Sequence, residues 1–181
     1  FDMRKENELI DVPPGTEFEI VYAQLQTLAV DLKLSKGWNL LGTPFMSADN
    51  VKVSSDNYDI NQAVKILWSW NAKGGGWKLS DFPLNSEMGY WLYLEEDSII
   101  SFPEGIKADG IINLHPGWNL ISPAEDIVFT KKSGIVNSAW KLENKSYIRV
   151  KEGELLKVGL AYWIFGDIKD SLIVDLKDIN Q

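Results

Sequence analysis

The chain repeats part of itself, and this internal repeat limits the fold more than any other feature of the sequence. Residues 32–43 read LKLSKGWNLLGT and residues 112–123 read INLHPGWNLISP, so a Gly-Trp-Asn-Leu core recurs 80 residues later. Further similarities follow in the same order, and they pair Trp70 with Trp140, Gly89-Tyr90-Trp91-Leu92 with Ala161-Tyr162-Trp163-Ile164, and Asp97-Ser98-Ile99-Ile100 with Asp170-Ser171-Leu172-Ile173. Because self-similarity at a long period is typical of repeated structural units, we expect two related units.

The spacing between matching positions indicates where these units begin and end. It changes from 80 residues to 70, then to 72 and 73, which indicates insertions and deletions in loops. Unit one is therefore expected at 31–110 and unit two at 111–181. The remaining residues, 1–30, are interpreted as the tail of a preceding domain or as a linker strand.

The local pattern within each unit is typical of β-strands. Hydrophobic and polar residues alternate in 32–34 and again in 112–114, which is the period of a half-buried strand. Gly37 and Gly117 occupy the third position of predicted turns, where a positive φ is needed. A hairpin loop is expected at 71–76, and Asn144-Lys145 occupies the matching place in the second unit.

Only one short helix is expected. Asp59 is followed three residues later by Gln62, which predicts a capping box that opens a turn or two of helix through Val64. The predicted fold is therefore all-β, with two tandem homologous small β-sandwich or barrel-like modules and one short helix.

Composition excludes several classes of protein. The 181 residues include no Cys and one His, which removes disulfide scaffolds, thiolate zinc sites, cysteine nucleophiles and multi-histidine metal centres. The formal net charge is -8, and long-range repulsion from phosphate opposes binding to nucleic acid. No apolar run approaches the length that spans a bilayer, so no membrane insertion is expected. No cofactor is expected either.

The recurring aromatic residues are interpreted first as structural. Large rings at equivalent positions of two units are expected to fill two equivalent hydrophobic cores, because each ring buries a large apolar area. The predicted core tryptophans are Trp38, Trp70, Trp91, Trp118, Trp140 and Trp163.

Aromatic residues without a counterpart in the other unit are better candidates for a ligand site. Trp68 has a small polar counterpart near Ser138, Trp77 follows a glycine-rich loop, and Tyr93 is expected to point outward, opposite to Trp91. Exposed rings of this kind bind the C–H faces of sugars, and nearby polar side chains hold the hydroxyl groups. The candidates for this polar role are Asp81, Asn85 and Glu87.

The sequence offers little for metal binding or catalysis. Asp49, Asp56 and Asp59 are weak candidates for an irregular calcium site, because residues 56–61 lack the glycine and glutamate positions of an EF-hand. His115 lies in a predicted turn, with no residue in the sequence to serve as its nucleophile or orienting group. A small hydrolase remains a third, weaker alternative, and the chain is expected not to be an enzyme.

The order of the motifs resembles a repeat found in bacterial secreted and cell-surface proteins. Such repeats read Gly-Trp-Asn-Leu, a small residue and Pro, then a strand ending in Trp, then Gly-Tyr-Trp. The first copy matches at 37–44, 67–70 and 87–92; the second departs from the pattern at Ser122 and Ala161, where the repeat has Gly. The resemblance implies an extracellular or cell-surface location and no catalytic residues.

The function expected from these observations is that of a non-catalytic structural or adhesive accessory region. Its partners would be neighbouring domains of a larger chain or other surface proteins, in contacts that assemble domains or attach to a surface. The alternative is a carbohydrate-binding module that holds a polysaccharide with Trp68, Trp77 and Tyr93.

Overall fold

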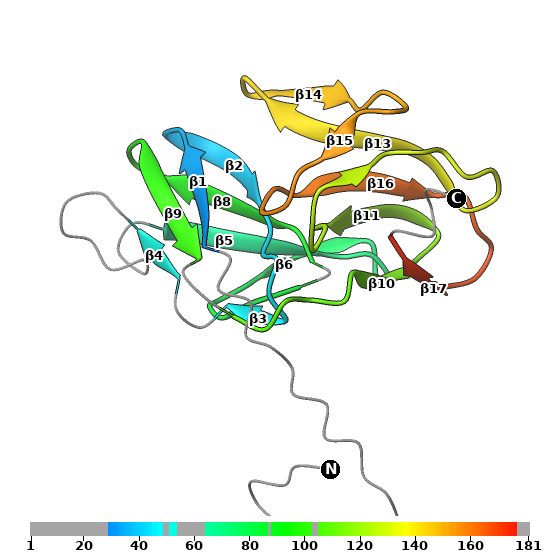
Figure 1. Cartoon of the computed structure of the whole chain (residues 1–181), viewed down its shortest axis with the longest axis horizontal. Helices are drawn as coiled ribbons and strands as arrows, with labels where there is room; N and C mark the ends of the chain where they lie inside the picture. The colour runs from blue at the N-terminus through cyan, green and yellow to red at the C-terminus, as the bar shows by residue number, and fades with distance from the viewer. Residues whose placement is uncertain (1–28, 49–50, 54–63, 87, 103–104, 177–181) are drawn as a thin grey trace, which may run out of the picture.

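A computed structural model of the chain describes residues 29–48, 51–53, 64–86, 88–102 and 105–176. Within these ranges every regular element is a β-strand and no helix occurs, which confirms the all-β prediction (Figure 1). The short helix expected from Asp59 lies outside the described residues. Its last expected residue, Val64, begins strand β5 instead.

The strands between residues 30 and 102 form three antiparallel sheets. The largest has the strand order β2-β8-β5-β6 and consists of Gly37–Leu41, Tyr90–Leu94, Val64–Asn71 and Gly76–Leu79. A three-stranded sheet has the order β1-β9-β4, from Val30–Leu34, Ser98–Phe102 and Lys52–Val53. A short ladder joins β3 and β7, Ser47–Ala48 and Leu84–Asn85.

The strands from residue 111 onward form a similar set of sheets. The four-stranded sheet has the order β11-β16-β13-β14 and consists of Gly117–Ile121, Tyr162–Gly166, Val136–Glu143 and Ser146–Arg149. Two-stranded ladders join β10 to β17 and β12 to β15, and these strands are Ile111–Leu114, Leu172–Asp175, Ile127–Val128 and Leu155–Leu156. None of these described sheets closes into a barrel.

Each half of the chain buries a hydrophobic core of its own. In the first half, Ile100 and Phe102 of the three-stranded sheet pack in one cluster with Leu67 and Leu92 of the four-stranded sheet. A separate cluster in the second half joins residues of β10, β11, β13, β16 and β17, including the fully buried Leu114. Burial of these apolar side chains is the main force that holds each pair of sheets together.

The turns form as the sequence predicts. Gly37 and Gly117 have φ angles of 99° and 83°, the region that glycine enters without steric cost. The loop after Asn71 closes the β5–β6 hairpin, and its counterpart between β13 and β14 places Asn144 and Lys145 at φ angles of 50° and 63°. Two positive φ angles in succession are typical of a tight hairpin turn.

The asparagine of each Gly-Trp-Asn-Leu motif locks the turn that precedes it. The Asn39 amide donates hydrogen bonds to the carbonyl oxygens of Ser35 and Gly37, at 2.8 and 2.9 Å. The Asn119 amide donates to the carbonyl oxygen of His115 at 2.8 Å, and its own carbonyl oxygen accepts from the His115 backbone N–H at 2.9 Å. The repeated motif is therefore a self-contained turn that starts an edge strand of its four-stranded sheet.

Strand β8 shows how side chains are divided between the core and the outer face. Tyr90, Leu92 and Leu94 are buried, whereas the intervening Trp91 and Tyr93 lie on the opposite side of the sheet. The expectation that Tyr93 points away from Trp91 is wrong, because residues two apart on a strand share one face.

The strand register also changes one of the pairings between the two halves. Trp68 lies opposite Trp91 in the first half, and Trp140 lies opposite Trp163 in the second. The position equivalent to Trp140 is therefore Trp68, not Trp70. A shift of two residues leaves a side chain on the same face, so the hydrophobic pattern does not reveal it.

The two halves contact one another beside their four-stranded sheets. Backbone hydrogen bonds of 2.9 Å run from Gly42 N–H to the Gly159 carbonyl oxygen and from Gly89 N–H to the Leu120 carbonyl oxygen. A small hydrophobic cluster spans the junction and contains Leu40, Leu120 and Ala161, with Trp70, Trp91, Leu142 and Trp163 packed against it. This cluster leads directly to the outer face, where the candidate site lies.

Candidate functional site

The tryptophans expected to fill the cores lie on the outer faces of the two four-stranded sheets. Trp38 and Trp118 are each 41% exposed, and the other four of the set are half-buried, namely Trp70, Trp91, Trp140 and Trp163. The prediction that these rings form the core interior is wrong. Alternation along the strands directs neighbouring leucine, isoleucine and tyrosine residues inward, which leaves the indole rings on the other side.

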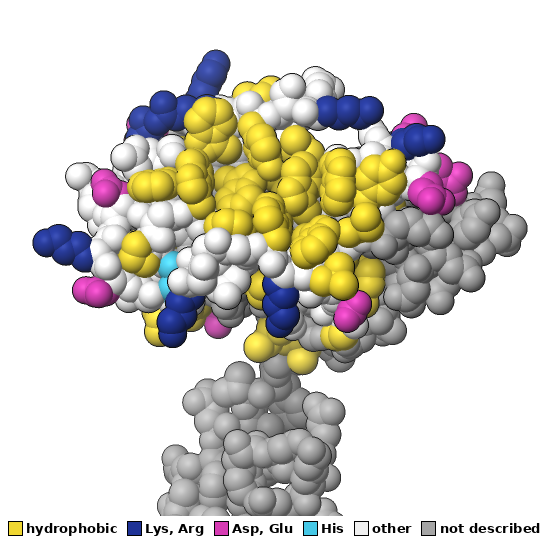
Figure 2. Space-filling view, turned by 180° about the vertical axis from the view of Figure 1, so that it is seen from behind, with side chains coloured by type: hydrophobic (Ala, Val, Ile, Leu, Met, Phe, Trp, Pro, Cys, Tyr) yellow, Lys and Arg dark blue, Asp and Glu magenta, His cyan; other side chains and the backbone are white. Residues whose placement is uncertain are grey.

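These rings form a continuous patch, which we call the aromatic surface. Figure 2 shows a broad hydrophobic area on this side of the molecule, with charged side chains around its edge. By strand register and ring contacts, its members are Trp38, Trp68, Trp70, Trp77, Trp91, Tyr93, Trp118, Trp140, Tyr147, Trp163 and Phe165.

Ring contacts connect the aromatic residues of one half to those of the other. The Trp163 ring lies 5.4 Å from the ring of Trp70 and 5.7 Å from that of Trp77, measured between ring centroids. The Trp91 ring lies 6.1 Å from that of Tyr147. Each hairpin thus sends an aromatic ring across to the middle strand of the other sheet, so the aromatic surface is a shared feature of both halves.

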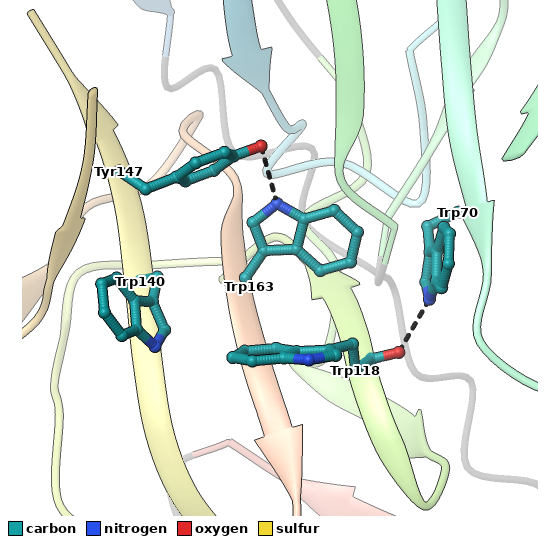
Figure 3. Close-up of a pocket in the computed structure, with 5 residues that line it drawn as sticks. All are labelled: Trp70, Trp118, Trp140, Tyr147 and Trp163. Carbon is teal, nitrogen blue, oxygen red and sulfur yellow. Dashed lines mark hydrogen bonds between the residues drawn. The ribbon is translucent and has the colours of Figure 1, made fainter. Parts of the chain in front are cut away.

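A hollow of about 400 Å³ opens in the aromatic surface (Figure 3). Five aromatic side chains line it, and they are Trp70, Trp118, Trp140, Tyr147 and Trp163. The plane of Trp118 is inclined by 87° to that of Trp163, and the plane of Trp70 by 73°. The hollow is therefore an open box with ring faces and edges on several sides, rather than a flat platform.

Two hydrogen bonds hold the walls of this hollow in place. The Trp163 indole N–H donates to the Tyr147 hydroxyl oxygen at 3.2 Å, and the Trp70 indole N–H donates to the Trp118 carbonyl oxygen at 2.7 Å (Figure 3). The second bond crosses between the halves. Within the described residues, no hydrogen bond engages the indole N–H groups of Trp118 and Trp140, so these two donors are available to a ligand.

The hollow has no ionised side chain in its lining. Packing against the neighbouring rings raises the pKa of the Tyr147 phenol, against the smaller lowering effect of the bond from Trp163, so the phenol stays neutral at physiological pH. Lys141 forms ion pairs with Glu143 and Glu154, but it alternates with Trp140 and so lies on the other face of β13.

A second hollow of about 360 Å³ lies at another part of the junction, and its lining mixes polar and apolar groups. Ser69 and Asn119 belong to that lining, but both are already engaged. The Ser69 hydroxyl bonds to that of Ser80 at 2.7 Å, and the Asn119 amide closes its own turn. These polar groups serve the fold, so the aromatic hollow is the stronger candidate for a site.

The structure places three of the predicted sugar-binding residues on the aromatic surface, although none lines the hollow. Trp77 is 43% exposed and packs on Trp70, whereas Trp68 and Tyr93 are half-buried. Asp81 and Asn85 are exposed and do not line the hollow. Glu87 lies outside the described residues, as do the weak calcium candidates Asp49, Asp56 and Asp59.

His115 lies in its predicted turn, and its Nδ1 atom is 2.6 Å from the Ser171 hydroxyl oxygen. This pair holds the turn against the loop before β17.

Among the described residues, no group of three or more His, Cys, Asp or Glu side chains is placed to hold a metal ion. No helix among the same residues is long and apolar enough to cross a membrane.

The sequence analysis did not identify Tyr147 as a site residue, and it did not predict the aromatic hollow that Tyr147 helps to line. The sequence does contain a pattern that indicates Tyr147, because Tyr147 follows Trp140 by seven residues, as Trp77 follows Trp70. The strand pairs confirm that Trp77 and Tyr147 occupy equivalent hairpin positions, opposite Trp70 and Leu142 respectively.

Comparison of the chain with protein-family models, curated proteins and solved structures finds no match.

Proposed function

We propose that this chain is a non-catalytic accessory region of a bacterial secreted or cell-surface protein and that it adheres to its partner through the aromatic surface. One observation carries the proposal, which is the continuous aromatic patch across both four-stranded sheets. Soluble proteins rarely expose large contiguous apolar patches, and those that do mostly use them for binding. Trp and Tyr are also the residues most enriched where partners bind tightly.

In this proposal the halves at 31–110 and 111–181 are homologous β-modules in tandem. The equal strand orders β2-β8-β5-β6 and β11-β16-β13-β14 support the homology, as do the two asparagine-locked turns. Packing two modules side by side joins two small aromatic patches into one larger surface, which gives the duplication a functional reason.

The proposed location outside the cell rests on the resemblance of the Gly-Trp-Asn-Leu and Gly-Tyr-Trp motifs to repeats of bacterial secreted proteins. The absence of a catalytic role is proposed because the one imidazole is engaged by Ser171 and because the hollow is lined only by aromatic side chains. Indole rings bind and orient a ligand but supply no nucleophile or general base, and burial raises the pKa of the Tyr147 phenol, which keeps that group neutral. Neighbouring domains and other surface proteins are the proposed partners.

A sedimentation assay with bacterial cell-envelope fragments tests the adhesive role. The full chain is expected to co-sediment with the fragments, and Trp77→Ala and Trp118→Ala are each expected to reduce the bound fraction several-fold. Ile173→Ala is the matched control, because Ile173 is an apolar residue of β17 that is 75% exposed and lies outside the aromatic surface. Equal co-sedimentation of all four proteins, or none by the wild type, would contradict the proposal.

Carbohydrate binding is the second candidate function. It is favoured by the exposure of Trp77, whose ring is 43% exposed and is inclined by 72° to the Trp70 ring. A sugar could stack on such a ring while its hydroxyl groups remain in water. Pull-down with insoluble polysaccharides tests this function: binding that Trp77→Ala abolishes would establish it, and binding that survives the substitution would not involve this ring.

A further inference from the structure

We propose that the aromatic hollow is a binding site for a trimethylammonium group, and that its natural occupant is a phosphocholine group. The inference rests on the proposed function, since it names the chemical group that the aromatic surface would recognise. It concerns only the hollow lined by Trp70, Trp118, Trp140, Tyr147 and Trp163.

The geometry of the rings points to a cation. Electron-rich ring faces attract a cation that lies within about 6 Å of a ring centroid, and Trp does so most strongly. Four of the five lining residues are Trp, and the planes of Trp118 and Trp163 are nearly perpendicular at 87°. In Figure 3, Trp118 and Tyr147 flank the Trp163 ring on two sides and Trp140 stands on a third. A roughly spherical cation can therefore contact several rings at once.

The polar groups of the hollow favour a ligand without hydroxyl groups. Of the four indole N–H groups in the lining, those of Trp70 and Trp163 are already used in hydrogen bonds and those of Trp118 and Trp140 are free among the described residues, and no carboxylate or amide side chain is part of the lining. An indole N–H donates but does not accept, so a sugar enclosed here would find few acceptors for its hydroxyl protons, which is unfavourable. A trimethylammonium group has no N–H or O–H, so it needs no acceptor from the aromatic lining.

The charge beside the hollow favours an anionic group next to the ammonium. At short range, Arg149 is exposed and lies opposite Trp140 in strand register, on the same face and beside the hollow. Side chains of opposed residues are neighbours on a sheet. A phosphate a few bonds from the ammonium would therefore meet Arg149, and this is why phosphocholine is preferred to trimethyl-lysine.

Titration of the full chain with choline, followed by tryptophan fluorescence, tests whether the aromatic hollow binds a trimethylammonium group. The matched probe is 3,3-dimethylbutan-1-ol, which has the same shape as choline but no charge. Choline is expected to bind saturably and at least about 10-fold more tightly than the neutral probe. Saturable choline binding that the neutral probe equals, or no choline binding, would overturn the inference.

Two substitutions at equivalent positions locate the site. Trp118→Leu keeps an apolar side chain but removes a ring of the hollow, so it should weaken choline binding by about 10-fold. Trp38→Leu is the control, because Trp38 is also 41% exposed and holds the same place in the first sheet, away from the hollow. Should Trp118→Leu fail to fold, Tyr147→Leu replaces it. Equal weakening by the control would overturn the assignment.

Two further ligands identify the occupant. Phosphocholine is expected to bind several-fold more tightly than choline, and Arg149→Gln should remove that advantage without weakening choline binding, because the substitution removes a like charge beside the ammonium. A trimethyl-lysine peptide that binds more tightly than phosphocholine would overturn phosphocholine as the occupant. If binding to envelope fragments requires Trp118 but choline does not bind, the proposed trimethylammonium site is overturned and the proposed adhesive function is supported.

Discussion

Gly89 and Ala161 occupy equivalent positions in the two halves, and they lie against each other at the junction. Each immediately precedes the buried tyrosine of the middle strand, Tyr90 in β8 and Tyr162 in β16. A Cβ atom on Gly89 would lie 2.5 Å from the Cβ atom of Ala161 and 2.8 Å from Cγ of Leu120. There is room for one methyl group at this point, and Ala161 has it.

The same arrangement occurs a second time. Gly42 and Ser122 follow the equivalent strands β2 and β11, and a Cβ atom on Gly42 would overlap the Cβ and Oγ atoms of Ser122. At these two positions the second half has Ser122 and Ala161 where the first half has Gly42 and Gly89. Both differences have one physical reason, since equivalent positions meet across the junction and only one member of each pair can carry a side chain.

Gly89→Ala should therefore destabilise the fold. The added methyl group has backbone and side-chain neighbours on several sides, and we expect the free energy of unfolding to fall by about 1–3 kcal/mol. Urea denaturation measures this loss. Gly76→Ala is the control, because a Cβ atom there would have no neighbour within 4 Å and Gly76 does not need a positive φ. A similar loss in both variants would contradict the steric explanation.

Exchange of the two residues tests the contact itself. In the double variant Gly89→Ala with Ala161→Gly, the single methyl group is supplied from the other side of the junction. Part of the stability lost in Gly89→Ala should return, because the exchange removes the contact with the Ala161 methyl group but not the one with Leu120, and the coupling between the two sites should be about 0.5–3 kcal/mol. Strict additivity of the two single effects would mean that the residues do not share one space.

Ser122 carries a buried hydroxyl group that the fold does not use. The residue is 2% exposed, and its Oγ atom has no hydrogen-bond partner among the described residues. Removal of an unpaired buried hydroxyl group removes a desolvation penalty, so Ser122→Ala should leave the free energy of unfolding unchanged or raise it by about 1 kcal/mol. Thermal and urea unfolding measure the change, and a clear loss of stability would show that the hydroxyl group is paired.

The two motif asparagines should contribute unequally to stability. Asn119 is 2% exposed and forms three hydrogen bonds within its turn, whereas Asn39 is half-buried and forms two. We expect Asn119→Ala to lower the free energy of unfolding by about 2–3 kcal/mol and Asn39→Ala by about 1 kcal/mol. Asn137→Ala, at an exposed strand position, is the control and should change it little. The reverse order of the two effects would contradict the role assigned to burial.

Much of the fold follows from local sequence patterns. The hairpin loops and the glycine turns were predictable because Gly37, Gly117 and Asn144 are residue types that tolerate a positive φ. The inward face was not predictable, because both faces of β8 are hydrophobic. Tyr90 and Leu92 alternate with Trp91 and Tyr93, and a period of two cannot say which pair enters the core.

The candidate site was harder to predict for a different reason. Four of its walls come from β11, β13, β14 and β16 and the fifth, Trp70, from β5, so the hollow is complete only when the first half packs against the second. Trp70 and Trp163 are 93 residues apart in the chain, yet their rings are 5.4 Å apart. The sequence shows which aromatic residues are present, but it does not show the contact between the two halves that brings their rings together.

The buried tyrosines give the protein a predictable sensitivity to alkali. Burial raises the pKa of Tyr90 and Tyr162 above the ordinary value of 10.0. Each hydroxyl oxygen also accepts a hydrogen bond from a backbone N–H group, which lowers the pKa by a smaller amount. Below pH 10 both states keep these protons, and stability is unaffected. Above it the unfolded chain releases them first, so the free energy of unfolding falls as the pH rises from about 10 through the raised folded-state values. Urea denaturation across this range should show the fall, and Tyr162→Phe should make it shallower although it removes the hydrogen bond from Lys157. An equally steep fall in that variant would assign the alkaline sensitivity to other groups.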